Sequence, residues 1–232
     1  MSFIAAMFLM YHLPYAPTEA EAAEAASERE DGEARAFWLL VAVMERDNGT
    51  NGPTLRTLYL PGMPGAREIL ATFDGLVARL LPKLARHMES QGVEPSMFGA
   101  SWLLPVFTRC FPFEVSRRAP RITSPSHPFS RALLRRARAR IQLVTRVWDV
   151  FIAEGSWKIA YRVSLAILKL FEAELLSVDL EGIMTRLRPD NVSRQLADAV
   201  ALDELWEVAF RFPLRSAAIQ QLHDQHVAEN PG

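Results

Sequence analysis

Apolar residues recur with helical spacing along most of the chain. In Ala66–Leu81 they fall on one face, and Ser156–Leu176 combines a broad apolar face with a narrow polar stripe. Helices require this period of about 3.6 residues, whereas a half-buried strand alternates with a period of two. We find no convincing alternation of period two and no internal repeat. The pattern predicts an all-α fold.

The centre of this pattern is a pair of helices joined by a tight corner. Leu143–Glu154 reads as a buried helix in which Trp148 and Asp149 lie between apolar residues, Gly155 breaks it, and the Ser156–Leu176 helix follows. Leu58–Gly65 reads as an extended approach with two Pro-Gly turns. The other expected helices are Ser2–Leu13, Glu33–Glu45, Pro82–Met88, Pro95–Cys110 with a kink or an early end at Pro105, Val178–Leu187, Asn191–Ala201, Leu202–Phe210 and Leu214–His226.

Ser2–Leu13 is apolar nearly all round, so we expect it to be buried, and Glu33–Glu45 reads as a second strongly buried helix. Residues 15–33 between them carry seven acids and one arginine with almost no apolar anchor. We therefore expect an acidic, solvated loop or frayed helix there. An acidic docking segment is the alternative.

Residues 115–142 differ from the rest of the chain. These 28 residues contain eight arginines, one histidine, three prolines and no acid. We expect an Arg/Pro-rich insert that is disordered; since Val115 can be encoded by a codon beginning GT and Gln142 by CAG, an in-frame retained intron is one hypothesis. A basic arm for nucleic acid or anionic lipid is the alternative.

Composition narrows the class of protein. The chain has 232 residues, of which 50% are apolar and 23% charged, with a formal net charge of -1. These values are typical of a soluble globular protein and give no electrostatic case for nucleic acid as a partner. No apolar run approaches the roughly 20 residues of a membrane span, so we expect no integral membrane segment. The single cysteine, Cys110, excludes an internal disulfide and fits a buried thiol in a reducing, cytoplasmic compartment.

Candidate catalytic groups are sparse. His223 and His226 could share a helix face and in principle hold a metal, but without a third ligand we expect a solvated face and no metal or cofactor. Arg146 is the expected ion-pair partner of Asp149, three residues later. His12 is expected in the core or at its boundary. No serine or cysteine lies in a nucleophile motif, so a self-contained enzyme is not expected.

Several stretches, in order, resemble the TBC domain, a helical module that acts as a GTPase-activating protein for Rab-type small GTPases. The first residues look like those just after the family's YxQG motif, and RVWD with EG looks like its C-terminal signature. The matching stretches are Met1–Ala6, Ala36–Leu40, Leu58–Gly65, Phe73–Asp74, Leu81–Pro82, Trp102, Phe107, Phe111–Pro112, Arg146–Asp149, Glu154–Gly155 and Leu202–Leu222.

The resemblance implies a multi-helix orthogonal array and makes residues 1–228 an incomplete TBC domain. It also implies binding to a GTP-loaded Rab, and a place in the cytoplasm or peripherally on endomembranes. The signature or partner-surface residues that it suggests are Ser2, Ser101, Trp102, Arg146, Trp148 and Asp149. Ser101, where the family usually has glutamine, and Pro105 depart from its pattern.

The family's mechanism, as the resemblance implies it, uses an arginine from an IxxDxxR motif and a glutamine from YxQG. An arginine finger is worth about 10³ to 10⁵ in rate. Neither motif occurs in the sequence, and both would lie upstream of Met1. We therefore carry over no catalytic residue and expect this chain alone to be inactive. The alternative is a non-catalytic helical module that binds a GTPase or a membrane-traffic partner.

Overall fold

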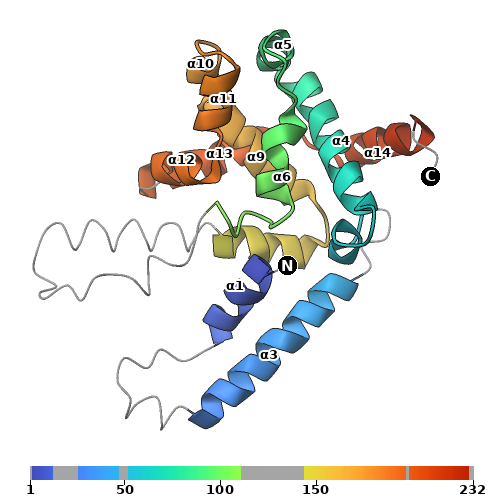
Figure 1. The fold of residues 1–232 in the computed structure, drawn as a ribbon, viewed down its shortest axis with the longest axis vertical. Coiled ribbons are helices and arrows are strands. Elements are labelled where there is room, and N and C mark those ends of the chain that lie inside the picture. Colours follow the sequence, from blue (N-terminus) through green and yellow to red (C-terminus); the bar gives the residue numbers. More distant parts are fainter. Residues whose placement is uncertain (1, 13–25, 47–51, 111–143, 197–198, 230–232) are drawn as a thin grey trace, which may run out of the picture.

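The computed structural model describes residues 2–12, 26–46, 52–110, 144–196 and 199–229 (Figure 1). These parts contain helices and turns and no strand, which confirms the predicted all-α fold. The predicted insert 115–142 lies outside the described residues, as does the first part of the predicted acidic loop. Within the described ranges, no helix has both the length and the hydropathy that crossing a bilayer requires.

The N-terminal helices form an antiparallel pair in Figure 1. They are α1 (Ser2–His12) and α3 (Ala26–Glu45), and they pack against each other. The short 3₁₀ helix η1 (Leu55–Leu58) contacts α3 and leads into turns before α4. The extended approach predicted within Leu58–Gly65 is therefore wrong. The turn predicted at Pro61-Gly62 is confirmed, whereas Pro64-Gly65 begins α4.

A second group of helices surrounds α9 (Lys158–Leu170) in the middle of the fold. Helix α4 (Pro64–Leu80) packs against α6 (Pro95–Leu103) and α14 (Ser216–Glu229), and α13 (Ala199–Arg211) packs against α9. A helix over residues 144–154 precedes α9. The remaining helices are α5 (Pro82–Ser90), α10 (Glu172–Leu175), α11 (Leu180–Arg186) and α12 (Pro189–Gln195).

One apolar core spans these helices. Its largest fully buried side chains include Trp102, Trp157, Tyr161, Phe73 and Phe107. Helix α9 contributes nearly its whole length, which explains why its polar stripe in the sequence is so narrow. Cys110 is buried, as predicted, and burial raises the pKa of its thiol well above the usual range.

The two helices predicted to be buried are instead buried on one side only. In α1, Ile4, Met7 and Phe8 face the core, whereas Phe3 is 51% exposed. In α3, Phe37 and Trp38 are 57% and 66% exposed. Helix α3 packs against α1 and η1, and its end meets helix 144–154, while Phe37 and Trp38 stay exposed among the described residues.

Two predicted boundaries also need correction. Residues 26–33 of the predicted acidic loop form the start of α3, which agrees with the frayed-helix alternative, because alanine and glutamate are strong helix formers. The single helix predicted for Ser156–Leu176 is divided at Phe171 into α9 and α10. The predicted early end at Pro105 is confirmed, since α6 stops at Leu103.

Candidate functional site

Trp148 is the point where three segments of the chain meet. Its indole is 3% exposed, and its Nε1–H donates to the carbonyl oxygen of Val106 at 3.1 Å. Its ring centre lies 5.3 Å from that of Phe8 on α1 and 5.6 Å from that of Phe151, both edge to face. Trp148 therefore joins helix 144–154 to α1 and to the turn that follows α6.

That turn has an unusual backbone. Val106 and Phe107 have φ angles of 44° and 63°, which residues with a side chain rarely adopt, least of all a β-branched valine. The Phe107 N–H donates to the carbonyl of Trp102 at 2.8 Å, and both side chains are fully buried. The Trp102 indole in turn donates to the carbonyl of Leu187 at 3.2 Å. The two signature tryptophans, Trp102 and Trp148, are thus scaffold residues whose side chains no partner can reach.

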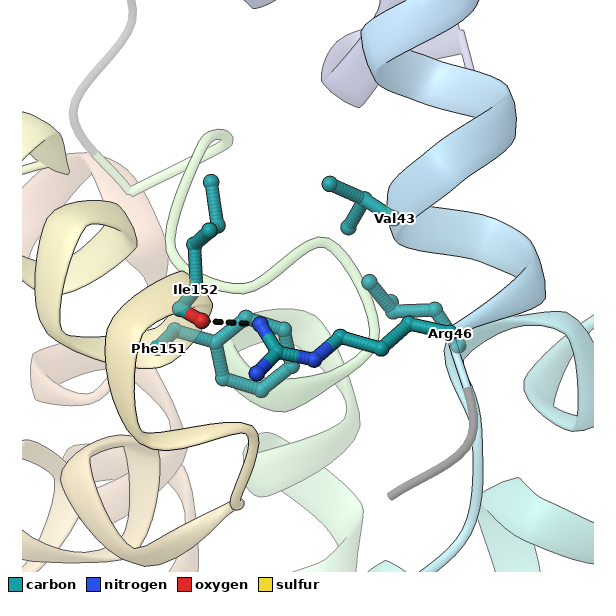
Figure 2. A pocket seen from close by; sticks show the side chains of 5 residues that line it. Val43, Arg46, Phe151 and Ile152 are labelled. Atoms are coloured by element: carbon teal, nitrogen blue, oxygen red, sulfur yellow. Dashed lines mark hydrogen bonds between the residues drawn. The ribbon is translucent and has the colours of Figure 1, made fainter.

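The predicted corner after helix 144–154 is confirmed at Gly155. Its φ is 59°, and its N–H donates to the carbonyl of Phe151 at 3.0 Å. A residue in the left-handed conformation that makes this bond is a common C-terminal cap of an α-helix. The side chain of Arg46, from the end of α3, crosses to this corner and donates to the carbonyl oxygen of Ile152 (Figure 2).

Figure 2 shows the pocket that Arg46 lines together with Val43, Phe151 and Ile152. Its volume is about 10 Å³, which holds a single water molecule at most. It cannot hold a nucleotide, so this pocket is a packing feature between α3 and helix 144–154.

The remaining predicted site residues lie nearer the surface. Ser2, Arg146 and Asp149 are exposed, and the half-buried Ser101 hydroxyl donates to the carbonyl of Phe98 at 2.7 Å. Figure 1 shows the start of α1, which bears Ser2, beside helix 144–154, which bears Arg146 and Asp149. The Phe8–Trp148 ring contact joins these two helices, each of which carries exposed predicted site residues.

The ion pair predicted between Arg146 and Asp149 is not among the contacts of the described residues. The Arg146 guanidinium carbon instead lies 4.7 Å from the ring centre of Trp206 on α13. Trp206 and Phe210, four residues apart on α13, were not among the predicted site residues. Their spacing of four residues on a predicted helix was the available signal, because such residues share a helix face.

Two carboxylates have perturbed titration. Burial of the Asp74 carboxylate is the main reason that its pKa rises to about 6. A hydrogen bond from the Ser96 backbone lowers this pKa, and the charge of Glu94 raises it. Burial also raises the pKa of Glu68, while the nearby His223 lowers it. His223 Nδ1 lies 2.8 Å from Glu68 Oε1, although outside the direction of a hydrogen bond.

This contact corrects the solvated position expected for His223. Its side chain is 24% exposed and faces α4, so it joins α14 to the body of the fold. Among the residues that the structure describes, no cluster of three or more histidine, cysteine, aspartate or glutamate side chains could hold a metal ion.

Comparison with known proteins decides the family. The profile of the Rab-GTPase-TBC domain matches residues 1–119, slightly more than half of the chain. The chain belongs to the Rab-GTPase-TBC domain family. Helices α1 to α6, and hence the turn that Trp148 holds, lie in the matched region.

Curated relatives agree with this assignment. The chain is 27% identical over 172 residues to the human ecotropic viral integration site 5 protein homolog, and the match covers 74% of this chain and 17% of that protein. It is 26% identical over 197 residues to the Rab GTPase-activating protein eat-17 of Caenorhabditis elegans, and the match covers 85% of this chain and 18% of that protein. It is 36% identical over 84 residues to the GTPase-activating protein GYP5 of Saccharomyces cerevisiae, and the match covers 36% of this chain and 9% of that protein. The chain thus spans less than a fifth of the length of these relatives.

Proposed function

We propose that this TBC chain binds a GTP-loaded Rab-type GTPase and supplies part of a Rab-GTPase-activating domain, while its 232 residues alone do not stimulate GTP hydrolysis. Family membership supports the choice of partner, as do the relatives whose names describe GTPase-activating proteins. In the complete domain, the reaction would be the attack of water on the terminal phosphate of GTP in the active site of the GTPase.

The observation that carries the second half of the proposal is the lack of both catalytic motifs. Neither IxxDxxR nor YxQG occurs among the 232 residues. An arginine finger stabilises the charge that develops on the phosphates, and a water-positioning glutamine orients the nucleophile. Without either group, the chain has no means of lowering the barrier of the reaction on a bound GTPase.

The arginines near the site do not replace the missing finger. The guanidinium of Arg46 donates to the Ile152 carbonyl, and that of Arg146 lies over the Trp206 ring. A finger must extend into the active site of a partner, so an arginine already held in an intramolecular contact would first have to leave it. Arg46 also fills the corner beside Gly155, which ties it to packing.

We place the GTPase-binding surface around the start of α1 and the exposed side of helix 144–154. Ser2, Phe3 and Asp149 are exposed there, and the buried Phe8–Trp148 contact holds the two helices together. In the family pattern the YxQG motif comes just before the residues that Met1–Ala6 resemble. The glutamine of a complete domain would therefore approach from this end of α1.

A non-catalytic binding module is the second candidate, and the lack of both motifs favours it for this chain. Two measurements separate the candidates: phosphate release from GTP-loaded Rab proteins, and binding of the chain to the same proteins loaded with GTP or GDP. Binding without faster hydrolysis is the expected result. Faster hydrolysis would contradict the proposal on catalysis, and equal failure to bind either form would contradict the proposal on the partner.

Adding the arginine and glutamine motifs tests whether the complete domain activates a GTPase. We expect a fusion that places the IxxDxxR and YxQG segments of a relative before Met1 to accelerate hydrolysis. A fusion with both finger residues changed to alanine is the matched control. If the fusion binds the GTPase but remains inactive, the non-catalytic module is the better description.

A further inference from the structure

Four side chains from three helices form a row that we call the Arg–aromatic stack. The Arg146 guanidinium carbon lies 4.7 Å from the centre of the Trp206 ring, and the Arg162 guanidinium carbon lies 5.3 Å from the centre of the Phe210 ring. The two rings stack on each other, with centres 5.8 Å apart and planes inclined by 24°. The order along the row is Arg146, Trp206, Phe210, Arg162.

The stack follows from the way the helices pack. Trp206 and Phe210 are four residues apart on α13, so they occupy neighbouring positions on one face. Helix α13 packs against α9, which carries Arg162, while Arg146 comes from helix 144–154. A guanidinium over an aromatic ring gains cation–π attraction and keeps a fixed orientation.

Both guanidinium groups retain hydrogen-bonding capacity. Among the described residues, no carboxylate forms an ion pair with Arg146 or Arg162, whereas the neighbouring cations Lys169 and Arg211 pair with Glu172 and Glu207. The Nε of Arg162 is buried without a hydrogen-bond partner in the described part of the chain. A stacked guanidinium presents its N–H groups at its edge, where they match a carboxylate in two-point contact.

The stack also has an exposed apolar component. Phe210 is 51% exposed, whereas Trp206 is only 7% exposed and anchors the row to the core. An exposed aromatic ring between two oriented cations combines apolar area with charge, and aromatic and arginine side chains are enriched where proteins bind partners.

We propose that the Arg–aromatic stack is a docking site for an acidic segment of a partner protein, which places carboxylates on Arg146 and Arg162 and an apolar side chain on Phe210. Charge complementarity supports this occupant. An anionic bilayer fits less well, because α13 also exposes Asp203, Glu204 and Glu207, which would repel a continuous negative surface. A peptide can place its carboxylates at the two arginines alone. Arg146 lies on helix 144–154, which also carries part of the proposed GTPase-binding surface, but binding at the stack needs neither nucleotide nor a Rab protein, so the two proposals are tested separately.

The test uses a fluorescein-labelled peptide in which two glutamates flank a leucine and all other residues are neutral, together with the 232-residue chain, and binding is followed by fluorescence anisotropy. The control peptide has glutamine in place of every glutamate. We expect the acidic peptide to bind and the control peptide to bind at least about tenfold more weakly, since a hydrogen bond to a charged group contributes about 1.5–3 kcal/mol. No binding of the acidic peptide at millimolar concentration, or equal binding of both peptides, would overturn the proposal.

Variants locate the site. Arg146→Gln and Arg162→Gln should each weaken binding about tenfold, whereas Lys169→Gln removes the same charge outside the stack and should change affinity less than about twofold. Arg146→Lys keeps the charge but loses the planar fork, so it should also weaken binding. Equal losses in all variants would show diffuse charge attraction and contradict a built site.

Two further measurements cover other outcomes. Circular dichroism tests whether each variant is folded. If a variant does not fold, the wild-type chain is used instead, and the shift of its Trp206 indole N–H resonance on adding the peptide reports whether the peptide reaches the stack. Vesicles of phosphatidylcholine with phosphatidylserine are the competing probe. Binding to these vesicles through the same arginines, without binding to the acidic peptide, would replace the proposal with a lipid site.

Discussion

The indole of Trp148 donates a hydrogen bond of 3.1 Å to the carbonyl of Val106, a residue whose φ of 44° is unfavourable for a β-branched side chain. The donor lies after the predicted insert 115–142 in the sequence, and the acceptor lies before it. One buried contact therefore links the two parts of the TBC signature. We interpret it as the reason that RVWD needs a tryptophan at this position.

Replacing this donor tests its role. Trp148→Phe keeps an aromatic ring but leaves the buried Val106 carbonyl without its indole donor, so we expect the free energy of unfolding to fall by about 1–3 kcal/mol. Thermal and urea unfolding measure the change. The matched control is Trp38→Phe, since Trp38 is 66% exposed and should cost less than about 0.5 kcal/mol. Equal costs at the two positions would contradict the role of the hydrogen bond.

The corner at Gly155 predicts a second effect. A Cβ there would lie 2.8 Å from a terminal nitrogen of Arg46, and the φ of 59° disfavours any side chain. We expect Gly155→Ala to destabilise the fold by about 1–2 kcal/mol from the backbone conformation alone, with a further cost from Arg46.

A second glycine separates the two causes. Gly92 has a φ of 69° with no atom within 4 Å of an added Cβ, so Gly92→Ala measures the backbone cost by itself. The difference between the two variants in urea unfolding gives the cost of displacing Arg46. A smaller cost at Gly155 than at Gly92 would show that Arg46 does not constrain the corner.

Helix α14 is the element whose position the sequence described least well. His223 was expected on a solvated face, but it contacts Glu68, and Leu222 lies against Gly75 of α4. Sequence spacing shows which residues share a helix face, but not which other helix that face meets. Helix α14 is polar along much of its length, so no continuous apolar stripe indicated its buried side.

Removing His223 should therefore loosen α14. We expect His223→Ala to remove the imidazole that contacts the half-buried Glu68 carboxylate and to raise the rate of amide hydrogen exchange in residues 216–229 several-fold. Gln221→Ala, at an exposed position on the same helix, is the matched control. Unchanged exchange in the His223 variant would mean that apolar contacts alone hold the helix.

Asp74 predicts the pH dependence of stability. Burial raises its pKa from 3.8 to about 6, so the folded state binds a proton in a range where the unfolded chain has released it. The resulting stability is fully present at low pH and is lost as pH rises through about 6. A shift of about two units represents roughly 3 kcal/mol, which partial solvent exposure reduces to the order of 1 kcal/mol.

Asp74→Asn should remove this dependence and raise the free energy of unfolding at pH 7.5 relative to the wild type. Urea unfolding between about pH 4 and 7.5, which spans the interval between the unfolded and folded pKa values, measures both effects, and Glu89→Gln, an exposed acid on α5, is the control. An unchanged pH profile in the Asp74 variant would show that this carboxyl does not carry the effect.

Helix α3 shows why burial was harder to predict than secondary structure. Residues 36–44 are apolar without interruption, so the sequence indicated a helix but no polar face. The structure buries Ala36, Val43 and Met44 and exposes Phe37 and Trp38, since only neighbouring helices decide which side is covered. The corner at Gly155 and the end of α6 near Pro105 were predictable because glycine and proline act locally.

For the candidate site too, the features set by local sequence were predictable and those set by packing between helices were not. The TBC signature was readable from short motifs, and the buried state of Cys110 followed from its residue type. The Arg–aromatic stack was not predicted, because Arg146, Arg162 and Trp206 lie on three helices and meet only after packing. The contact expected for Arg146 was a local one with Asp149, and a tertiary contact with Trp206 took its place.

The central claim is that this chain carries a TBC scaffold without the groups that act on GTP. The most direct measurement is the rate of phosphate release from a panel of GTP-loaded Rab proteins with and without the 232-residue chain, at concentrations where an active TBC protein serves as positive control. We predict that the chain leaves every rate at its intrinsic value, because neither finger motif is present. Acceleration of any Rab by tenfold or more would contradict this account.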